Sequence, residues 1–349
     1  MNAMINEKCT LLEKNRAAVK EKFAFEENLM GVVAGFIYTS EQKEADADKM
    51  LECRKILRKQ TGIFSELRST VELVILSKMA LADDPGQYLE DIKEVNKRIC
   101  GAKLSTGTNS ILASVIICDV GMKDGCDEVI AKANALMKRM EKDHPFLTGA
   151  EDVSSVMLMA LSYKEADKLL ADLEEGYTYI KKTYKPGISA DAVQGVCEIL
   201  AMTYGDTKAK CDKVMRIYKA LKDRKANFST DEKFAVLAAL AETDVAPETL
   251  AEDIAYASDT LKTMNGFDKT RMDDKERFMY ATLVVADAYG KDSNIAGSTV
   301  INNTISIITA KRTAMIMNLV MNIAPTLLGA CADMAQPAET QEESSGERE

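Results

Sequence analysis

The apolar residues of this 349-residue chain recur at helical spacing along most of its length. They often return every three or four residues, as in Leu170, Leu173, Tyr177 and Ile180. That period places them on one face of a helix, and Lys, Glu, Asp and Arg occupy the other faces. The stretches 111–120, 153–161 and 234–240 are instead apolar nearly all round, which is typical of buried helices. The pattern therefore predicts an all-α protein with buried and half-exposed helices.

The two kinds of helix alternate with a period of about forty residues. Successive buried helices begin 40, 42, 40, 41 and 44 residues apart, counted between their first apolar anchors. These anchors are Val71, Ile111, Val153, Val193, Phe234 and Phe278. Most of them follow Ser, Thr or Asp, whose side chains cap helix N-termini. We expect tandem helix-hairpin repeats that form an α-solenoid or a curved two-layer helical array, either open or closed.

The pattern divides the chain into four segments. Residues 1–60 are expected to form an N-terminal helical cap, because terminal repeats are usually atypical. Residues 61–290 hold the helical-hairpin repeats, and 291–335 form an apolar C-terminal helical segment. Residues 336–349 are polar and acidic, so we expect a disordered tail.

The apolar C-terminal segment allows two interpretations. Between Ile295 and Ala332 the only charged residues are Lys311 and Arg312, and the uncharged stretch 313–332 is long enough to span a bilayer. However, Asn318 lies within that stretch, and an unpaired amide is costly in hydrocarbon. Burial against the helical array or in an oligomer contact is therefore preferred, and a membrane segment is the alternative.

Charge and cysteine usage narrow the class of protein. The net charge is -10 and no block is strongly basic, which argues against a nucleic-acid partner. The eight cysteines form no C-x-x-C pair, and the N-terminus lacks the apolar run of a signal peptide. These features predict reduced thiols and a cytoplasmic location, with membrane association through 313–332 as the alternative.

Residue types that carry out catalysis are scarce. His144 is the only histidine, and we expect it to be a loop residue near a helix end. Zinc sites need several Cys and His at ligand spacing, so no metal or cofactor is predicted. An enzyme in a closed helical array would instead need carboxylates that converge in one cavity. The inner helices offer Asp119, Glu198 and Asp287 for that alternative.

A protein-interaction scaffold is the favoured function, because helical repeats expose extended surfaces to partners. We expect a protein partner or self-association. The loops that precede the buried helices recur on one side of the array and form the expected interaction edge. Its residues are Thr106, Gly107, Thr148, Gly149, Ser189 and Ser229. The two Thr-Gly pairs are interpreted as helix caps, with a backbone anion site as the alternative.

Two segments also resemble a known family. They are Phe146-Leu147-Thr148-Gly149-Ala150-Glu151-Asp152 and Leu11-Leu12-Glu13-Lys14-Asn15-Arg16, the latter followed by Phe23 and Leu29-Met30. Both are similar to an all-helical family of Gram-positive bacteria that is catalogued as a domain of unknown function. The resemblance covers the chain from Asn6 to Ala332. It implies a helical fold and no particular activity, cofactor or site residue.

Overall fold

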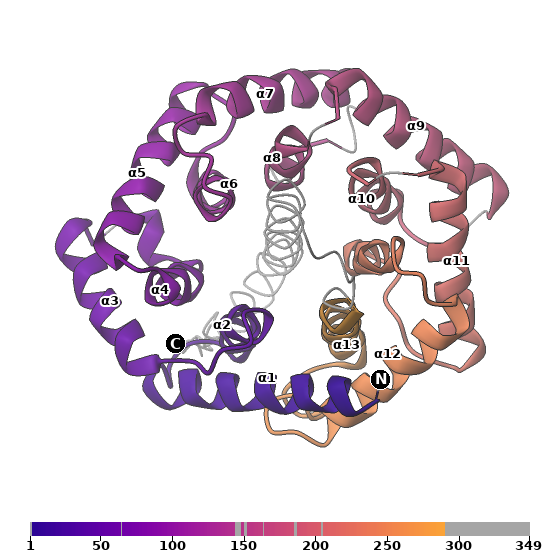
Figure 1. Ribbon diagram of the computed structural model, residues 1–349, viewed down its shortest axis with the longest axis horizontal. Helices are drawn as coiled ribbons and strands as arrows, with labels where there is room; N and C mark the ends of the chain where they lie inside the picture. The colour runs from indigo at the N-terminus through magenta and orange to yellow at the C-terminus, as the bar shows by residue number, and fades with distance from the viewer. Residues whose placement is uncertain are drawn as a thin grey trace, which may run out of the picture.

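The helices form a ring with an outer and an inner layer (Figure 1). The computed structural model describes residues 2–63, 65–143, 148–149, 152–162, 164–184, 187–203 and 205–289, which contain helices and turns and no strand. The outer helices are α1 (Asn2–Lys22), α3 (Ala47–Gln60), α5 (Pro85–Gly101), α7 (Cys126–Asp143), α9 (Ala166–Thr183), α11 (Thr207–Asp223) and α12 (Pro247–Lys262). The inner layer consists of α2 (Asn28–Ser40), α4 (Glu72–Leu81), α6 (Gly107–Asp119), α8 (Val153–Leu161), α10 (Ala190–Ala201), η3 (Glu232–Leu240) and α13 (Asp274–Tyr289). A short 3-10 turn, η1 (Glu66–Arg68), precedes α4.

Local sequence explains where many of these helices begin. Asp46, Ser189 and Asp206 each accept a hydrogen bond from a backbone amide in the first turn of the helix that follows. Such caps satisfy amides that have no partner within the helix. Pro85 and Pro247 occupy the first positions of α5 and α12, where the missing amide costs nothing.

The inner helices contain most of the core. The anchors Val71, Ile111, Val153, Val193 and Phe234 are at most 1% exposed, and Phe278 is partly buried. The segment around Phe234 differs from the others because η3 is a 3-10 helix rather than an α-helix. Small residues lie where η3 meets α10: a β-carbon added to Gly195 would be 3.2 Å from the β-carbon of Ala235. The tighter helix therefore packs closely on its neighbour.

The outer layer closes on itself. Each outer helix packs against the next, and α12, the last of them, packs against α1 (Figure 1). Arg16 of α1 donates hydrogen bonds to Oδ1 of Asn28 at 2.6 and 3.0 Å and to the carbonyl of Asn265 at 3.3 Å. Asn28 in turn donates to the carbonyl of Gly266 at 3.0 Å. The segment 1–60, expected as a cap, thus supplies the outer helices α1 and α3 and the inner helix α2.

Three predicted features lie outside the described residues: the apolar segment 291–335, the acidic tail 336–349 and the loop residue His144. Within the described ranges, no helix combines the length and the apolar character that a membrane span needs.

Candidate functional site

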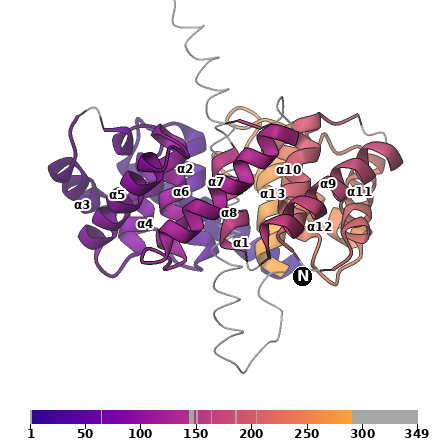
Figure 2. The same ribbon diagram turned by 90° about the horizontal axis from the view of Figure 1, so that it is seen from above.

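The ring has two faces. Because the chain alternates between layers, the inner helices all begin at one face and end at the other (Figures 1 and 2). We call the first the start face; it includes the connections 23–27, 102–106, 224–231 and 263–273. The second, the end face, includes the connections 41–46, 82–84, 120–125 and 241–246. The outer helices run obliquely around the ring, back from the end face towards the start face (Figures 1 and 2).

Charged residues of opposite sign gather at the two ends of the outer helices. Their last turns carry lysine or arginine, namely Lys20, Lys22, Arg58, Lys59, Arg98, Lys142, Lys181, Lys182, Lys222 and Lys262. Their caps and first turns, towards the end face, carry Asp46, Asp48, Asp84, Asp127, Glu128, Asp167, Asp206 and Glu248. Each charge complements the dipole of its own helix. Where one outer helix meets the next, some of these charges pair with each other: Lys22 lies 3.0 Å from Asp48, and Arg98 lies 3.5 Å from Asp127.

The two most exposed large apolar side chains lie on the start face. Phe25, in the turn between α1 and α2, is 104% exposed, and Ile63, after α3, is 72% exposed. Phe23, two residues before Phe25, is buried beneath the guanidinium of Arg54 at 5.1 Å from its ring centroid. Arg54 is held by Glu72 at 2.6 Å and by Glu26 at 2.8 Å. The contacts of Phe23 and Arg54 therefore hold the turn in place, and Phe25 projects into solvent.

The first predicted edge residues, Thr106 and Gly107, lie at the start of α6. Thr106 is exposed, extended and makes no side-chain cap hydrogen bond. Gly107 has φ +68°, a left-handed conformation that favours glycine, and nothing would contact a β-carbon there. The hydroxyl of Thr106 and the backbone at Gly107 therefore face solvent.

The remaining edge residues act mainly as caps. Ser189 is exposed and accepts a hydrogen bond from the amide of Ala192 at 3.1 Å. Its own amide donates to the carbonyl of Thr230 at 2.9 Å, which brings it close to Ser229. Ser229 is buried, and its hydroxyl donates to Asp231. Thr148 and Gly149 are half-buried before α8, and the Gly149 amide donates to Asp152 at 2.8 Å.

The carboxylates considered for an enzyme have separate partners. Asp119 lies 2.7 Å from the ammonium of Lys78 and accepts a 2.6 Å hydrogen bond from Tyr88. Asp287 pairs with Lys8 of α1, across the closure of the ring. Glu198 accepts a hydrogen bond from Gln194, one turn earlier on the same helix, at 3.0 Å. Among the described contacts, no two of these three carboxylates share a partner.

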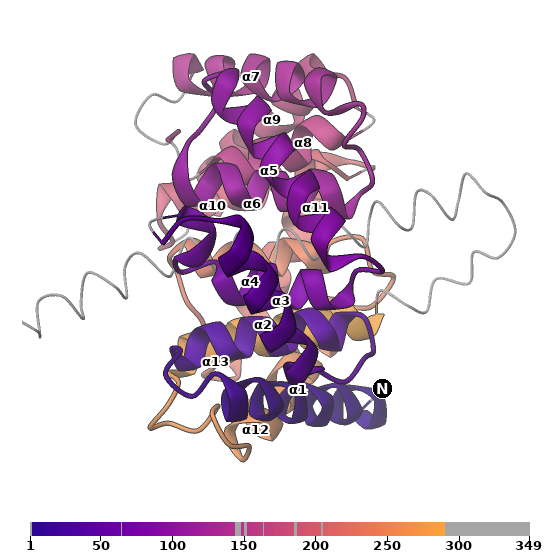
Figure 3. The same ribbon diagram turned by 90° about the vertical axis from the view of Figure 1, so that its left-hand side faces the viewer.

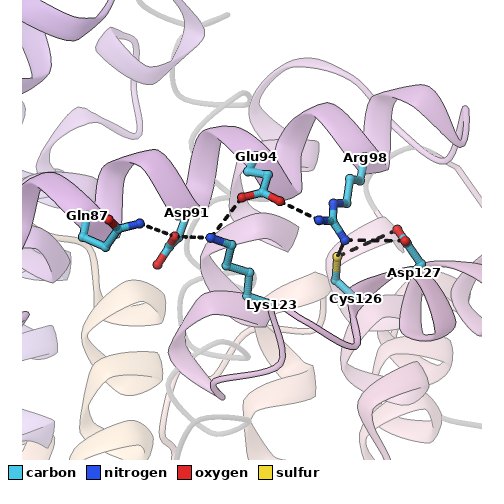
Figure 4. A network of polar contacts seen from close by, with 7 residues as sticks. All are labelled: Gln87, Asp91, Glu94, Arg98, Lys123, Cys126 and Asp127. Atoms are coloured by element: carbon cyan, nitrogen blue, oxygen red, sulfur yellow. Dashed lines mark hydrogen bonds and ion pairs between the residues drawn. The ribbon is translucent and has the colours of Figure 1, made fainter.

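A charged network links α5 to the connection between α6 and α7 (Figure 4). Lys123 bridges Asp91 at 2.6 Å and Glu94 at 2.9 Å. Arg98 binds the other side of Glu94 at 2.5 Å and reaches Sγ of Cys126 at 3.4 Å. Hydrogen bonds from Lys123 and Arg98 lower the pKa of Glu94, so this carboxylate stays ionised. The network holds helices together and offers no unpaired base.

A second polar cluster lies at the end of α10. Lys164 is 2.9 Å from Asp172 and donates to the carbonyl of Ala201 at 2.8 Å. Lys210 donates to the carbonyl of Leu200 at 2.7 Å. Burial, and secondarily the charge of Lys164, lowers the pKa of Lys210. These ammonium groups satisfy carbonyls at the negative end of the helix dipole, which is a structural role.

The described cysteines are all free thiols: Cys9, Cys53, Cys100, Cys118, Cys126, Cys197 and Cys211. Burial raises the pKa of Cys9 and of Cys118 to about 12, far above that of a reactive thiol. Within the described ranges, no group of three or more His, Cys, Asp or Glu side chains is placed to hold a metal ion.

Comparison with known proteins gives one match. A family model described as a protein of unknown function (DUF4003) matches residues 15–314. The searches of curated proteins and of solved structures found no match.

Proposed function

The chain belongs to the DUF4003 family of proteins of unknown function, and we propose that it is a non-catalytic scaffold that binds an acidic protein partner through the start face. The observation that carries the proposal is the exposed aromatic anchor Phe25, on the face towards which the outer helices end in lysine or arginine. Aromatic residues dominate the energy of protein interfaces, and complementary charge guides the partner to them.

The charge of the chain favours a local partner surface over a nucleic acid. The net charge of -10 opposes wrapping by a polyanion, whereas exposed lysines such as Lys182 and Lys222 can attract a local acidic patch. The exposed edge residues Thr106 and Ser189 add hydrogen-bonding groups to this face. We expect the protein to act in the cytoplasm of a Gram-positive bacterium.

We further propose that the ring consists of tandem hairpin repeats of about forty residues. Support comes from one position on the outer helices, occupied by Asp91, Lys132, Asp172, Lys213 and Asp253 at spacings of 41, 40, 41 and 40 residues. Four of these side chains contact residues at the end of the inner helix that follows. Asp172 does so through Lys164, which binds the carbonyl of Ala201. The same contact between an outer helix and the end of the next inner helix thus recurs along the chain, and the outer-helix residue is alternately acidic and basic.

Affinity capture from native cytosol, with the full-length protein as bait, tests the scaffold. Lys182→Glu combined with Lys222→Glu reverses two exposed charges of the start face. Lys43→Glu combined with Lys208→Glu makes the same charge change towards the opposite face and serves as the matched control. We expect a stoichiometric partner that wild type and control retain and that the start-face variant loses. Equal capture by all three proteins, or no stoichiometric partner, would contradict the proposal.

Phe25→Ala separates binding from folding. Because Phe25 is fully exposed, its removal should leave the melting temperature unchanged while it weakens capture of the same partner. A membrane-associated protein held by 313–332 and an enzyme based on carboxylates are the alternative functions. Partner capture that depends on neither the start-face lysines nor Phe25 would favour these alternatives.

A further inference from the structure

Two cysteines lie together between the layers of the ring. Cys197 belongs to the inner helix α10 and Cys211 to the outer helix α11, and both residues are at most 1% exposed. Both helices pack against α9 and against each other (Figures 1 and 3). The pair therefore lies where three described helices meet.

The two sulfurs approach each other beside Gly176 of α9. A β-carbon at Gly176 would lie 3.2 Å from Sγ of Cys197 and 3.4 Å from Sγ of Cys211, with a methyl group of Thr207 also at 3.4 Å. Both sulfurs therefore border the same small space. Glycine inside a helix is destabilising relative to alanine, so its presence here needs a reason. The missing side chain leaves the room in which the two sulfurs meet.

The two thiols differ in acidity. The thiol of Cys197 donates a hydrogen bond to Sγ of Cys211, and this bond, with the nearby charge of Lys210, lowers the pKa of Cys211. The same hydrogen bond, together with burial, raises the pKa of Cys197. By contrast, burial alone raises the pKa of Cys9 to about 12. A thiol of lowered pKa next to a second thiol is typical of redox-sensing pairs.

We propose that Cys197 and Cys211 form a reversible redox site that hydrogen peroxide oxidises to a disulfide. The thiolate of Cys211 attacks one oxygen of the peroxide, which gives a sulfenic acid and releases hydroxide. The thiol of Cys197 then attacks the sulfenic sulfur, so that an S–S bond forms and the hydroxyl group leaves as water with the thiol proton. The hydroxide takes up the proton that Cys211 had lost. Two thiols are thus oxidised, and one peroxide is reduced to two waters.

The disulfide would join the inner layer of the ring to the outer layer. Cys211 lies about one turn from the start of α11, and helix ends open locally, which admits a molecule as small as hydrogen peroxide. Disulfides of cytoplasmic proteins are usually transient and often redox-sensing, and a small thiol restores the pair by exchange. Because the cross-link restricts the unfolded chain, the oxidised protein should melt at a higher temperature than the reduced one.

Peroxide treatment of the full-length protein tests the site independently of the scaffold function. After exposure to hydrogen peroxide, the remaining thiols are blocked with a maleimide in urea and the peptides are mapped by mass spectrometry. We expect a disulfide peptide that joins Cys197 to Cys211, and the return of both thiols with dithiothreitol. Absence of that peptide would overturn the proposal, whether all eight thiols persist or other cysteines are oxidised.

Single variants separate the roles of the two thiols. In Cys197→Ala, the sulfenic acid of Cys211 should persist, and dimedone should label it. In Cys211→Ala, Cys197 should stay an unlabelled thiol. Cys100→Ala replaces a half-buried cysteine of α5 and is the matched control, which should form the disulfide as the wild type does. Labelling of Cys197 in place of Cys211 would overturn the assigned roles, and the mapping of the wild type decides the proposal even where a variant folds poorly.

Discussion

Arg16 of α1 lies directly against Gly266 in the connection between α12 and α13. A β-carbon on Gly266 would overlap the guanidinium of Arg16, and Gly266 has φ +90°. The start and end of the ring therefore meet at a residue that must be glycine for two reasons.

Gly266→Ala should destabilise the protein by about 3 kcal/mol, since backbone strain and overpacking each cost on the order of 1–3 kcal/mol. Urea unfolding at neutral pH measures the effect. Gly101→Ala is the control, because nothing lies within 4 Å of a β-carbon there. It should change stability by less than about 0.5 kcal/mol. Similar losses in both variants would show that the contact with Arg16 is unimportant.

The Lys8–Asp287 pair makes a second closing contact, between α1 and α13. Its side chains are only 7% and 16% exposed. Asp287→Ala should cost about 3 kcal/mol, because it leaves a buried ammonium without its partner. The double variant Lys8→Met/Asp287→Leu should recover most of that loss in the same unfolding measurement. Glu248→Ala, which breaks the exposed pair with Arg216, should cost less than about 0.5 kcal/mol. A double variant as unstable as the single one would argue against ring closure by this pair.

The buried Tyr280 and the half-buried Tyr88 should respond in opposite ways to loss of the hydroxyl. Within the described residues, no hydrogen-bond partner reaches the hydroxyl of Tyr280, which is 0% exposed. Tyr280→Phe should therefore stabilise the protein by about 1 kcal/mol. Tyr88 donates to Asp119 at 2.6 Å, so Tyr88→Phe should destabilise it by about 2 kcal/mol. Thermal unfolding of both variants is the test, and a loss in Tyr280→Phe would mean that its hydroxyl is bonded in solution.

The all-helical fold and the buried anchors were predictable because both depend on local periodicity. Val71, Ile111 and Val193 recur at a spacing that one sequence can reveal, and they are buried as expected. The family resemblance, drawn from two short segments, is confirmed by the match over 15–314.

Closure of the ring was not predictable in the same way. It depends on contacts such as Arg16 with Asn265, which are 249 residues apart and follow no period. The exposed anchor Phe25 also escaped notice, because an apolar residue two positions after the buried Phe23 reads as core. The series from Asp91 to Asp253 was visible in its spacing. Because the residues of this series alternate between acidic and basic, a search for similar residues at a fixed spacing does not find it.

Acid should weaken the cluster at the end of α10 through Asp172. Burial opposes ionisation of this carboxyl, but hydrogen bonds from Lys168 and Lys164 outweigh burial and keep its pKa below the usual 3.8. Because the folded pKa is the lower one, the stabilisation is complete above about pH 3.8 and is lost as pH falls through the folded value. Asp172→Asn should cost about 3 kcal/mol at pH 7.

The difference between wild type and Asp172→Asn should shrink as pH falls below about 3.8. Chemical unfolding at several pH values measures it. Glu165→Gln is the control, since that carboxylate is exposed and its replacement should change stability little. A difference for Asp172→Asn that does not change with pH would show that the ammonium partners do not set its ionisation.

Closure of the ring also constrains synthesis of the protein. Helix α1 is translated well before its partners α12 and α13. Until then the surface of α1 that will meet them, with Ile5, Cys9 and Leu12 among its buried apolar residues, lacks those partners. A nascent chain in this state exposes a ready site for association with other chains. Closure of the ring is therefore a long-range docking event, and its speed decides whether each newly made chain closes on itself or joins another.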